Sequence, residues 1–229
     1  MVKNHLKTIA TPRTWKLNRK ETVFTTRPLP GAHKLELGFS INHLLKKELK
    51  MCKITKEAKF ILNSKKCYVN NKPVLDVHYM VGLMDVVSFP ELSKYYRVVL
   101  NENGFITAVE IDEKESNLLL CKLINKTKLK NNEIQLNTLN ARNIKVKKDE
   151  YKTSGSLLIE LPSQKILEYF PLEQGSTVML IGGKNRGQIG VIDKVDDSKI
   201  YFKKDSKTYL TLKKFAFVLG KNKPRIKIR

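Results

Sequence analysis

The sequence predicts a mostly β protein of the α+β class that is built from several small units. Strand-like runs recur at roughly 8 to 12 residue spacing through the middle and the last third of the chain. Apolar residues at helical spacing occupy one short region, residues 41–62. The chain has 229 residues, of which 41% are hydrophobic, so it can fill ordinary cores. Because domains usually contain roughly 100 to 150 residues, a single small module is not expected.

The charge of the chain points to a polyanionic partner. Lysine and arginine number 44 against 22 aspartate and glutamate, a formal net charge of +22. Such an excess repels itself unless a partner neutralises it, which makes nucleic acid the first candidate and an anionic membrane surface the second. No stretch approaches the roughly 20 apolar residues that span a bilayer. The first residues also lack the apolar core of a secretory signal, so we expect an intracellular protein.

Residues 1–40 form a basic arm in this interpretation. Positions 1–34 hold eight basic residues and one acid, with prolines at 12, 28 and 30. Proline favours extended backbone, and the few apolar side chains, Trp15 among them, are too sparse for a core of their own. We therefore expect an extended arm that its partner orders, with Trp15 stacking on a base or docking on the protein surface. A tail without function is the alternative.

Two short amphipathic helices and a hairpin are predicted in residues 41–92. Ile41, Leu44, Leu45 and Leu49 share one helical face. A second helix follows Thr55 as a candidate N-cap, with Ala58, Ile61 and Leu62 on its apolar face. After it, residues 67–69 are predicted as a strand, residues 70–73 as its turn, and residues 85–89 as a further strand.

Lysines surround this helix pair and its hairpin. Helix N-termini carry unpaired N–H groups and partial positive charge, so lysines near them would reinforce a phosphate-binding surface. The alternative is a solvated helix face without a ligand. The candidate phosphate contacts are Lys53, Lys56, Lys59, Lys65, Lys66 and Lys72.

A central β domain is predicted for residues 93–172. Residues 95–100 and 105–111 are expected to form a hairpin, because the turn at 101–104 ends in Gly104, which tolerates positive φ. One helical turn at 112–117 follows. Further strands are predicted at the four runs 118–124, 133–136, 157–161 and 166–170, which together suggest a small barrel or sandwich.

Apolar residues in the last third of the chain recur with a period of two. This pattern predicts a second β unit, 173–219, which is followed by a basic tail, 220–229. Strands are expected around 178–181, 189–195, 199–203 and 208–219. The loop Gly182–Gly187 lacks the spacing of a phosphate-binding or dinucleotide-binding loop, which disfavours nucleotide binding. A strand-connecting turn, whose glycines only permit positive φ, explains this loop as well as a function for its basic residues does.

No catalytic or metal-binding set is apparent. Cys52, Cys67 and Cys121 are widely separated, which predicts reduced thiols without a metal. A zinc site would need these cysteines together with one of four isolated histidines, His5, His33, His43 and His78. No hydrolase or metalloprotease motif occurs, and an enzyme is not expected.

Several longer motifs carry a family resemblance. The helix pair with its hairpin resembles the alpha-L RNA-binding module of ribosomal proteins and RNA-modifying enzymes. The segments HLKTIATPRTW from His5, RPLPGAHK from Arg27 and VGLMDVVSFPE from Val81 are similar to the e-type family of small-subunit ribosomal protein number four. The likeness continues through the glycine-rich loop, which resembles a KOW motif, to FVLGKNKP from Phe217.

This resemblance implies a ribosomal-RNA-binding structural protein of the small subunit, located in the cytoplasmic ribosome. The implied fold is a basic arm, an alpha-L module, a central β domain, an SH3-like KOW barrel and a basic tail. Neighbouring ribosomal proteins are expected partners, without cofactor, metal, DNA, membrane or homo-oligomer. The further RNA-contact candidates are His5, Lys7, Arg13, Trp15, Arg27, His33, Lys34, Lys184, Arg186, Lys221, Lys223 and Arg225.

Two other functions remain as alternatives. A KOW-type barrel also suits a transient RNA-binding transcription or translation factor. The alpha-L resemblance also allows an RNA-modifying enzyme that uses one aspartate, for which Asp85 is the candidate. Fold likeness alone does not confer a catalytic site, and little chain remains for a catalytic domain.

Overall fold

The computed structural model describes residues 4–130, 133–204 and 207–229. It divides into two compact units, which we describe separately. Unit 1 comprises Met1–Val99 and Phe105–Asn117, and unit 2 comprises Leu100–Gly104 and Leu118–Arg229. Residues 1–3 of the predicted arm lie outside the described ranges. Within those ranges, no helix is long and apolar enough to cross a membrane.

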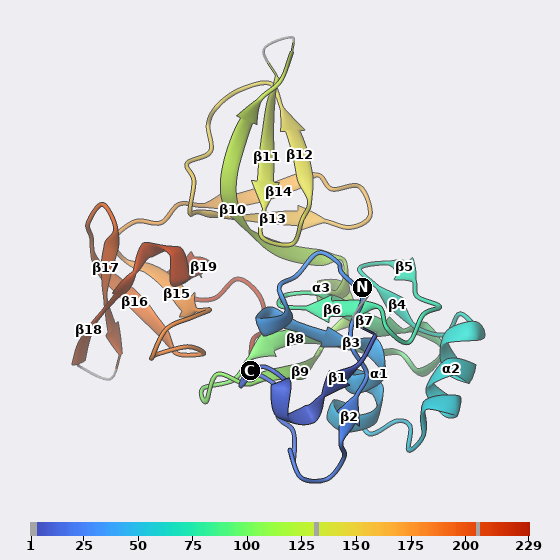
Figure 1. The fold of residues 1–229 in the computed structure, drawn as a ribbon. Helices are drawn as coiled ribbons and strands as arrows, with labels where there is room; N and C mark the ends of the chain where they lie inside the picture. Colours follow the sequence, from blue (N-terminus) through green and yellow to red (C-terminus); the bar gives the residue numbers. More distant parts are fainter. Residues whose placement is uncertain (1–3, 131–132, 205–206) are drawn as a thin grey trace. The chain divides into compact units, whose positions relative to one another are not determined.

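The predicted helix pair is present in unit 1. α1 (Ile41–His43) continues as a π-helical turn to Glu48, and α2 runs over Thr55–Asn63 (Figure 1). The Ser40 hydroxyl accepts a hydrogen bond from the His43 N–H at 3.3 Å and so caps α1. Ile41, Leu44 and Leu45 are fully buried, as the helical spacing predicts. Ala58 and Leu62 bury the matching face of α2.

A five-stranded sheet accompanies these helices in the order β5-β4-β7-β8-β9. Its strands are β4 (Tyr68–Val69), β5 (Lys72–Pro73), β7 (Val86–Phe89), β8 (Lys94–Leu100) and β9 (Ile106–Ile111). The β8–β9 hairpin and the helical turn α3 (Glu113–Ser116) confirm the local predictions. However, β8 and β9 continue the sheet of the helix pair, so the predicted domain boundary at 92/93 differs from the structure. Strand pairing depends on partners distant in sequence, which local alternation does not reveal.

The hairpin β4–β5 turns more tightly than predicted. Asn70 and Asn71 both have positive φ, at 49° and 62°, which is the backbone of a two-residue hairpin turn. Lys72 and Pro73 consequently belong to the returning strand, where Tyr68 pairs with Pro73. The expected turn over residues 70–73 is therefore two residues too long.

The N-terminal arm is folded onto unit 1. β1 (Leu6–Lys7) pairs with β2 (Phe24–Thr25), and β3 (Gly38–Ser40) pairs with β6 (Met80–Gly82). Buried side chains of the arm include Thr8, Thr11, Thr14 and Trp15. The Thr14 carbonyl also accepts the Ile106 N–H at 2.8 Å. The expectation of an arm ordered only by its partner is wrong, because later segments supply the apolar surface that the arm itself lacks.

The first sheet of unit 2 has the order β12-β11-β10-β13-β14. Its strands are β10 (Leu118–Lys128), β11 (Ile134–Thr138), β12 (Asn143–Val146), β13 (Ser156–Glu160) and β14 (Ile166–Phe170). β10 is long and curved (Figure 1) and pairs with β13 through its first half and with β11 through its second. β12, a four-residue strand in which polar and apolar residues alternate, was not predicted from the sequence.

The second sheet of unit 2 has the order β18-β17-β16-β15-β19. Its strands are β15 (Ser176–Leu180), β16 (Ile189–Val195), β17 (Lys199–Lys204), β18 (Lys207–Leu212) and β19 (Ala216–Lys221). The predicted single run 208–219 is broken by a 3₁₀ turn, Lys213–Phe215. Because of this turn, β18 pairs with β17, whereas β19 pairs with β15 at the other end of the sheet.

Lys122 on β10 is a buried cation within unit 2. Its Nζ donates hydrogen bonds to the carbonyls of Lys214 at 2.7 Å and Ala216 at 2.6 Å. Burial lowers the pKa of Lys122 to about 8. The unfolded chain, where lysine titrates near 10.4, therefore binds more protons between about pH 8 and 10.

We expect the free energy of unfolding to rise over that pH window by up to about 3 kcal/mol, since one pKa unit corresponds to about 1.4 kcal/mol. Urea unfolding at several pH values, followed by far-UV circular dichroism, measures this rise. Lys122→Met is the control, because its unfolding free energy should lack this component. Identical pH profiles of the two proteins would contradict the prediction.

Candidate nucleic-acid interface

The basic side chains predicted on the arm are accessible in the structure. His5, Lys7, Arg13 and Lys34 are exposed, and Arg27 is half-buried. The β1–β2 pairing places Lys7 directly opposite Phe24, and the His5 and Phe24 rings lie 5.6 Å apart. The arm thus presents these cations on a folded segment, whereas the sequence suggested an extended arm that its partner would order.

Trp15 is a core residue, which corrects its assignment as an RNA contact. Its side chain is 3% exposed, and its indole N–H donates to the Gly38 carbonyl at 3.0 Å. The ring also packs against Phe39 and His43, at centroid distances of 6.4 and 5.3 Å. A buried indole with a satisfied N–H has no free face for a base. Of the two outcomes considered for Trp15, docking on the protein itself is the one observed.

His33 is likewise buried, and its partner is Asp85. His33 Nε2 lies 2.8 Å from Asp85 Oδ2. Burial lowers the pKa of His33, but the charge and the hydrogen bond of Asp85 together raise it above its ordinary value. The assignment of His33 as an RNA contact is therefore corrected to a structural one, because its ring faces a carboxylate inside unit 1.

Asp85 organises the segments around it. Its Oδ1 accepts a hydrogen bond from Asn70 Nδ2 at 2.8 Å, and its Oδ2 accepts the Gly82 N–H at 2.9 Å. Burial raises the pKa of Asp85, but His33, Asn70 and Gly82 together lower it, so the carboxylate stays ionised. A Cβ at Gly82 would lie 2.2 Å from the His33 ring, so glycine lets the histidine approach. Asp85, the candidate for an RNA-modifying reaction, is therefore a buried carboxylate held by three partners and is not accessible to RNA.

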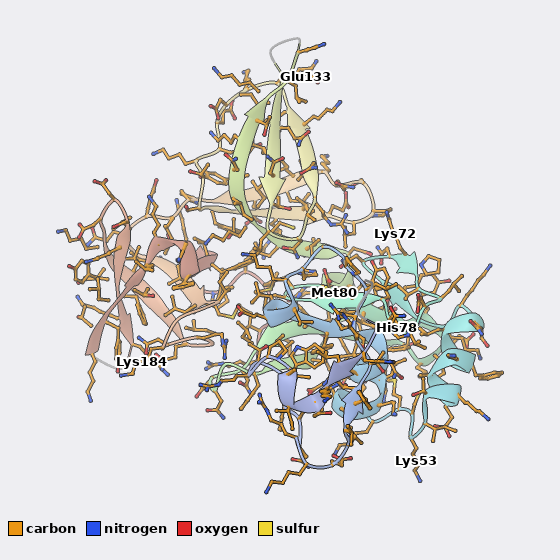
Figure 2. All side chains as sticks on the ribbon, viewed as in Figure 1. Lys53, Lys72, His78, Met80, Glu133 and Lys184 are labelled. Atoms are coloured by element: carbon orange, nitrogen blue, oxygen red, sulfur yellow. The ribbon has the colours of Figure 1, made fainter. Side chains whose placement is uncertain are left out.

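The lysines of α2 and the hairpin are exposed. Lys53, Lys56 and Lys59 lie before and along α2, with Lys56 and Lys59 three residues apart on the same side. Lys65 is also exposed, as are Lys66 and Lys72. In Figure 2, Lys53 and Lys72 lie at opposite ends of the region around α2 and β5. The structure thus spreads these cations over an extended surface.

The N-terminus of α2 is occupied by a carboxylate of the chain itself. Glu57 Oε2 accepts the N–H groups of Lys53 at 2.7 Å and Ile54 at 3.3 Å, and these bonds lower the pKa of Glu57. Ile54 holds the N-cap position, so Thr55 is the first helical residue and not the cap. The expected phosphate site at this helix end is therefore corrected, because Glu57 already compensates its positive charge.

The glycine-rich loop between β15 and β16 is a turn. Gly183 and Gly187 have φ of 81° and 83°, which confirms that backbone geometry requires glycine here. Lys184 is exposed at this loop (Figure 2). Arg186 is half-buried. Of the two predicted contacts in this loop, Lys184 is therefore the more accessible.

The C-terminal tail is basic on one side only. Lys221, Lys223 and Arg225 are exposed, as predicted, and Arg225 Nε pairs with Glu168 at 3.0 Å. Ile226 and Ile228 are buried, at 3% and 5% exposure. The tail is therefore anchored by its alternate apolar residues and is not a free arm.

Two exposed aromatic side chains, one on β2 and one on α2, were not predicted from the sequence as candidate contacts. Phe24 on β2 is 55% exposed and Phe60 on α2 is 70% exposed. Phe60 falls outside the apolar face of Ala58, Ile61 and Leu62, a signal that was present in the sequence. The exposure of Phe24 depends on the register of β1 with β2, which has no local signal.

The described ranges contain no group of three histidine, cysteine, aspartate or glutamate side chains that could hold a metal ion. Cys52, Cys67 and Cys121 are buried free thiols. Burial raises the pKa of Cys67 to about 12, so its thiolate, the form that binds metals, is disfavoured.

Comparison with known proteins gives consistent matches along the chain. The model of the ribosomal family S4e matches residues 92–166, that of the RS4NT (NUC023) domain residues 2–36, and that of the KOW motif residues 174–204. The crystal structure of the 30S ribosomal protein S4e from Thermoplasma acidophilum has a TM-score of 0.71 and 24% identity, covering 81% of this chain and 96% of that one. This likeness shows the fold.

Curated relatives share more of the sequence. The small ribosomal subunit protein eS4 of Methanosphaera stadtmanae is 34% identical, with 99% of this chain and 96% of the relative covered. The proteins of the same name from Methanococcus vannielii and Korarchaeum cryptofilum are each 33% identical over 98% of this chain and 97% of their own length. With these relatives matched over nearly their whole length, the chain belongs to the S4e family of ribosomal proteins.

Proposed function

We propose that this chain is a structural constituent of the small ribosomal subunit and binds ribosomal RNA through its exposed cations. The observation that carries the proposal is that the lysine and arginine side chains predicted as RNA contacts, the basic set, are accessible in a chain that belongs to the S4e family. Every predicted lysine and arginine contact is exposed or half-buried. Within the described ranges, Lys66 and Arg225 are the members of this set that pair with a carboxylate, Glu91 and Glu168.

The mechanism is charge neutralisation of folded RNA. Lysine and arginine side chains release the counterions condensed on phosphates, which favours binding without reading the sequence. RNA helices are recognised mainly by shape, since side chains cannot read their narrow major groove. The protein would thus hold RNA segments at fixed distances inside the particle. The family is structural, and the chain is not an enzyme.

Replacing Lys53, Lys56 and Lys59 together with glutamine tests the α2 surface. We expect weaker binding to a small-subunit ribosomal RNA transcript, and a salt slope of the binding constant reduced by up to about 2.7 if each lysine contacts one phosphate. Exposed charges contribute little to folding, so the urea midpoint should stay unchanged. Filter binding at several salt concentrations measures the affinity.

A matched control removes three exposed lysines elsewhere. Lys145, Lys147 and Lys148 lie on or beside β12, outside the predicted contacts, and are exposed. Their replacement with glutamine changes the net charge equally. Equal loss of affinity in both variants would show that overall charge alone attracts the RNA, and the α2 surface would lose its role.

A salt wash of small subunits distinguishes a constituent from a transient factor. Recovery of the native protein mainly in the supernatant, after small subunits are washed at moderate salt, would favour a transient factor over a constituent.

A further inference from the structure

The arm hairpin carries two aromatic rings and a cation on one face. In the antiparallel pair β1–β2, Lys7 lies opposite Phe24 and Leu6 lies opposite Thr25. Side chains alternate between the two faces of a strand, so His5 and Lys7 share one face with Phe24, whereas Leu6 lies on the other. Leu6 is half-buried, while His5, Lys7 and Phe24 are exposed. The hairpin therefore turns its aromatic face away from the core.

The two rings contact each other and leave surface uncovered. Their centroids are 5.6 Å apart with an interplanar angle of 53°, and the Phe24 side chain is 55% exposed. An Arg27 guanidinium N–H reaches the His5 carbonyl at 3.5 Å, which brings a second cation to the same hairpin. A phenylalanine this exposed gains little from folding, because most of its apolar area stays in water.

From this juxtaposition we propose that His5, Lys7 and Phe24 form a stacking site for an unpaired RNA base, with Lys7 and Arg27 contacting the flanking phosphates. Proteins that bind single-stranded RNA combine aromatic side chains, on which bases stack, with cations that follow the backbone. The proposal rests on the proposed function, because it names the RNA element that the arm takes. It gives the arm the aromatic contact first expected of Trp15.

Charge favours RNA over a protein partner at this face. Ile9 and Val23 lie beside the hairpin and are 76% and 68% exposed, so a protein surface could also cover the region. The aromatic face itself, however, includes Lys7 directly opposite Phe24, and Arg27 is bonded to the His5 carbonyl beside it. A cation beside an aromatic ring suits a phosphate next to a base, whereas apolar protein interfaces exclude lysine from their centres.

The test compares Phe24→Leu with the unchanged protein. Leucine keeps an apolar side chain but removes the aromatic ring. The probes are a short single-stranded oligoadenylate, an RNA duplex of the same length and the small-subunit ribosomal RNA transcript. We expect the affinity for oligoadenylate to fall by about 5- to 150-fold, the range of one lost base stack. The salt slope should stay the same, because phenylalanine carries no charge. Duplex affinity should not change.

Two further variants make the result interpretable. Phe24→Trp should retain binding and place a fluorophore in the site, whose emission should be quenched when oligoadenylate binds. Ile9→Ala removes neighbouring apolar surface and should leave the affinity for both RNA probes unchanged. Because both substituted positions are exposed, the urea midpoint of each variant should stay that of the unchanged protein.

The outcomes separate this inference from the proposed function. If the unchanged protein binds RNA and Phe24→Leu binds oligoadenylate equally well, the stacking site is wrong while the proposed function stands. If Phe24→Leu keeps its RNA affinity but no longer joins small subunits, the face contacts a protein and the stacking site is again wrong. If the unchanged protein binds none of the RNA probes at low salt, the proposed function itself fails.

Discussion

Replacing Asp85 with alanine is expected to lower the free energy of unfolding of unit 1 by about 3 to 5 kcal/mol, the usual cost of removing one partner of a buried ion pair. The carboxylate accepts bonds from His33, Asn70 and Gly82, and its loss leaves these donors without their acceptor. Buried groups that lose their partners keep the cost of desolvation without its compensation.

Trp15 offers the readout for this variant. It is the one tryptophan in the sequence and is buried in unit 1, so urea unfolding followed by its fluorescence reports on that unit. Asp112→Ala is the control, because Asp112 is exposed and its side chain makes no capping bond to α3. Its effect should stay within about 0.5 kcal/mol. Equal unfolding curves for the two variants would contradict the structural role of Asp85.

The pKa shifts of His33 and Asp85 also predict the pH range in which this pair contributes most to the stability of unit 1. Folding raises the pKa of His33, so its contribution is complete below the unfolded value of about 6.5 and declines as the pH rises through the folded value. Folding lowers the pKa of Asp85, so its contribution is complete above about 3.9 and declines as the pH falls through the folded value. The stability difference between the unchanged protein and Asp85→Ala should therefore be greatest between about pH 4 and 6.5.

The affinity for small-subunit ribosomal RNA is expected to fall by about 10³ to 10⁵ between 50 and 200 mM salt, if roughly six to ten phosphates are engaged. Unit 1 alone presents enough candidates for that number, since all its predicted lysines and arginines are exposed or half-buried. Each neutralised phosphate contributes about 0.9 to the slope of log K against log salt, by the relation for B-DNA.

Filter binding over this salt range measures the slope, with an uncharged solute at matched osmolality as the control for non-ionic effects. A slope close to zero would contradict charge neutralisation as the mechanism. The slopes measured for the α2 variant and for its β12 control then show how much each surface contributes. Each replaced lysine that contacts a phosphate should reduce the slope of log K against log salt by about one.

Elements that depend on neighbouring residues were predictable from the sequence. The apolar spacing around Ile41 and Ala58 predicted both helices, because a helix brings residues three and four apart onto one face. Glycine marked the turns at Gly104, Gly183 and Gly187, which all have positive φ. The exposure of the predicted lysines followed from chemistry, since a charged side chain is rarely buried without a partner.

Side chains whose environment comes from distant segments were not predictable. Trp15 and His33 lie in a basic stretch that suggested RNA contact, but Gly38 and Asp85 supply their buried partners. Phe24 is exposed because β1 pairs with β2 in one particular register, and a shift of one residue would turn it to the other face.

By itself the sequence determined the basic character of the chain, its mostly β composition and its family resemblance, because charge, periodicity and motifs are carried by residues close together in the chain. Only the tertiary structure decided which aromatic and charged groups of the arm face solvent, and that β8 and β9 join the sheet of the helix pair. Burial and strand pairing depend on contacts between residues far apart in sequence, whose energies no local pattern records.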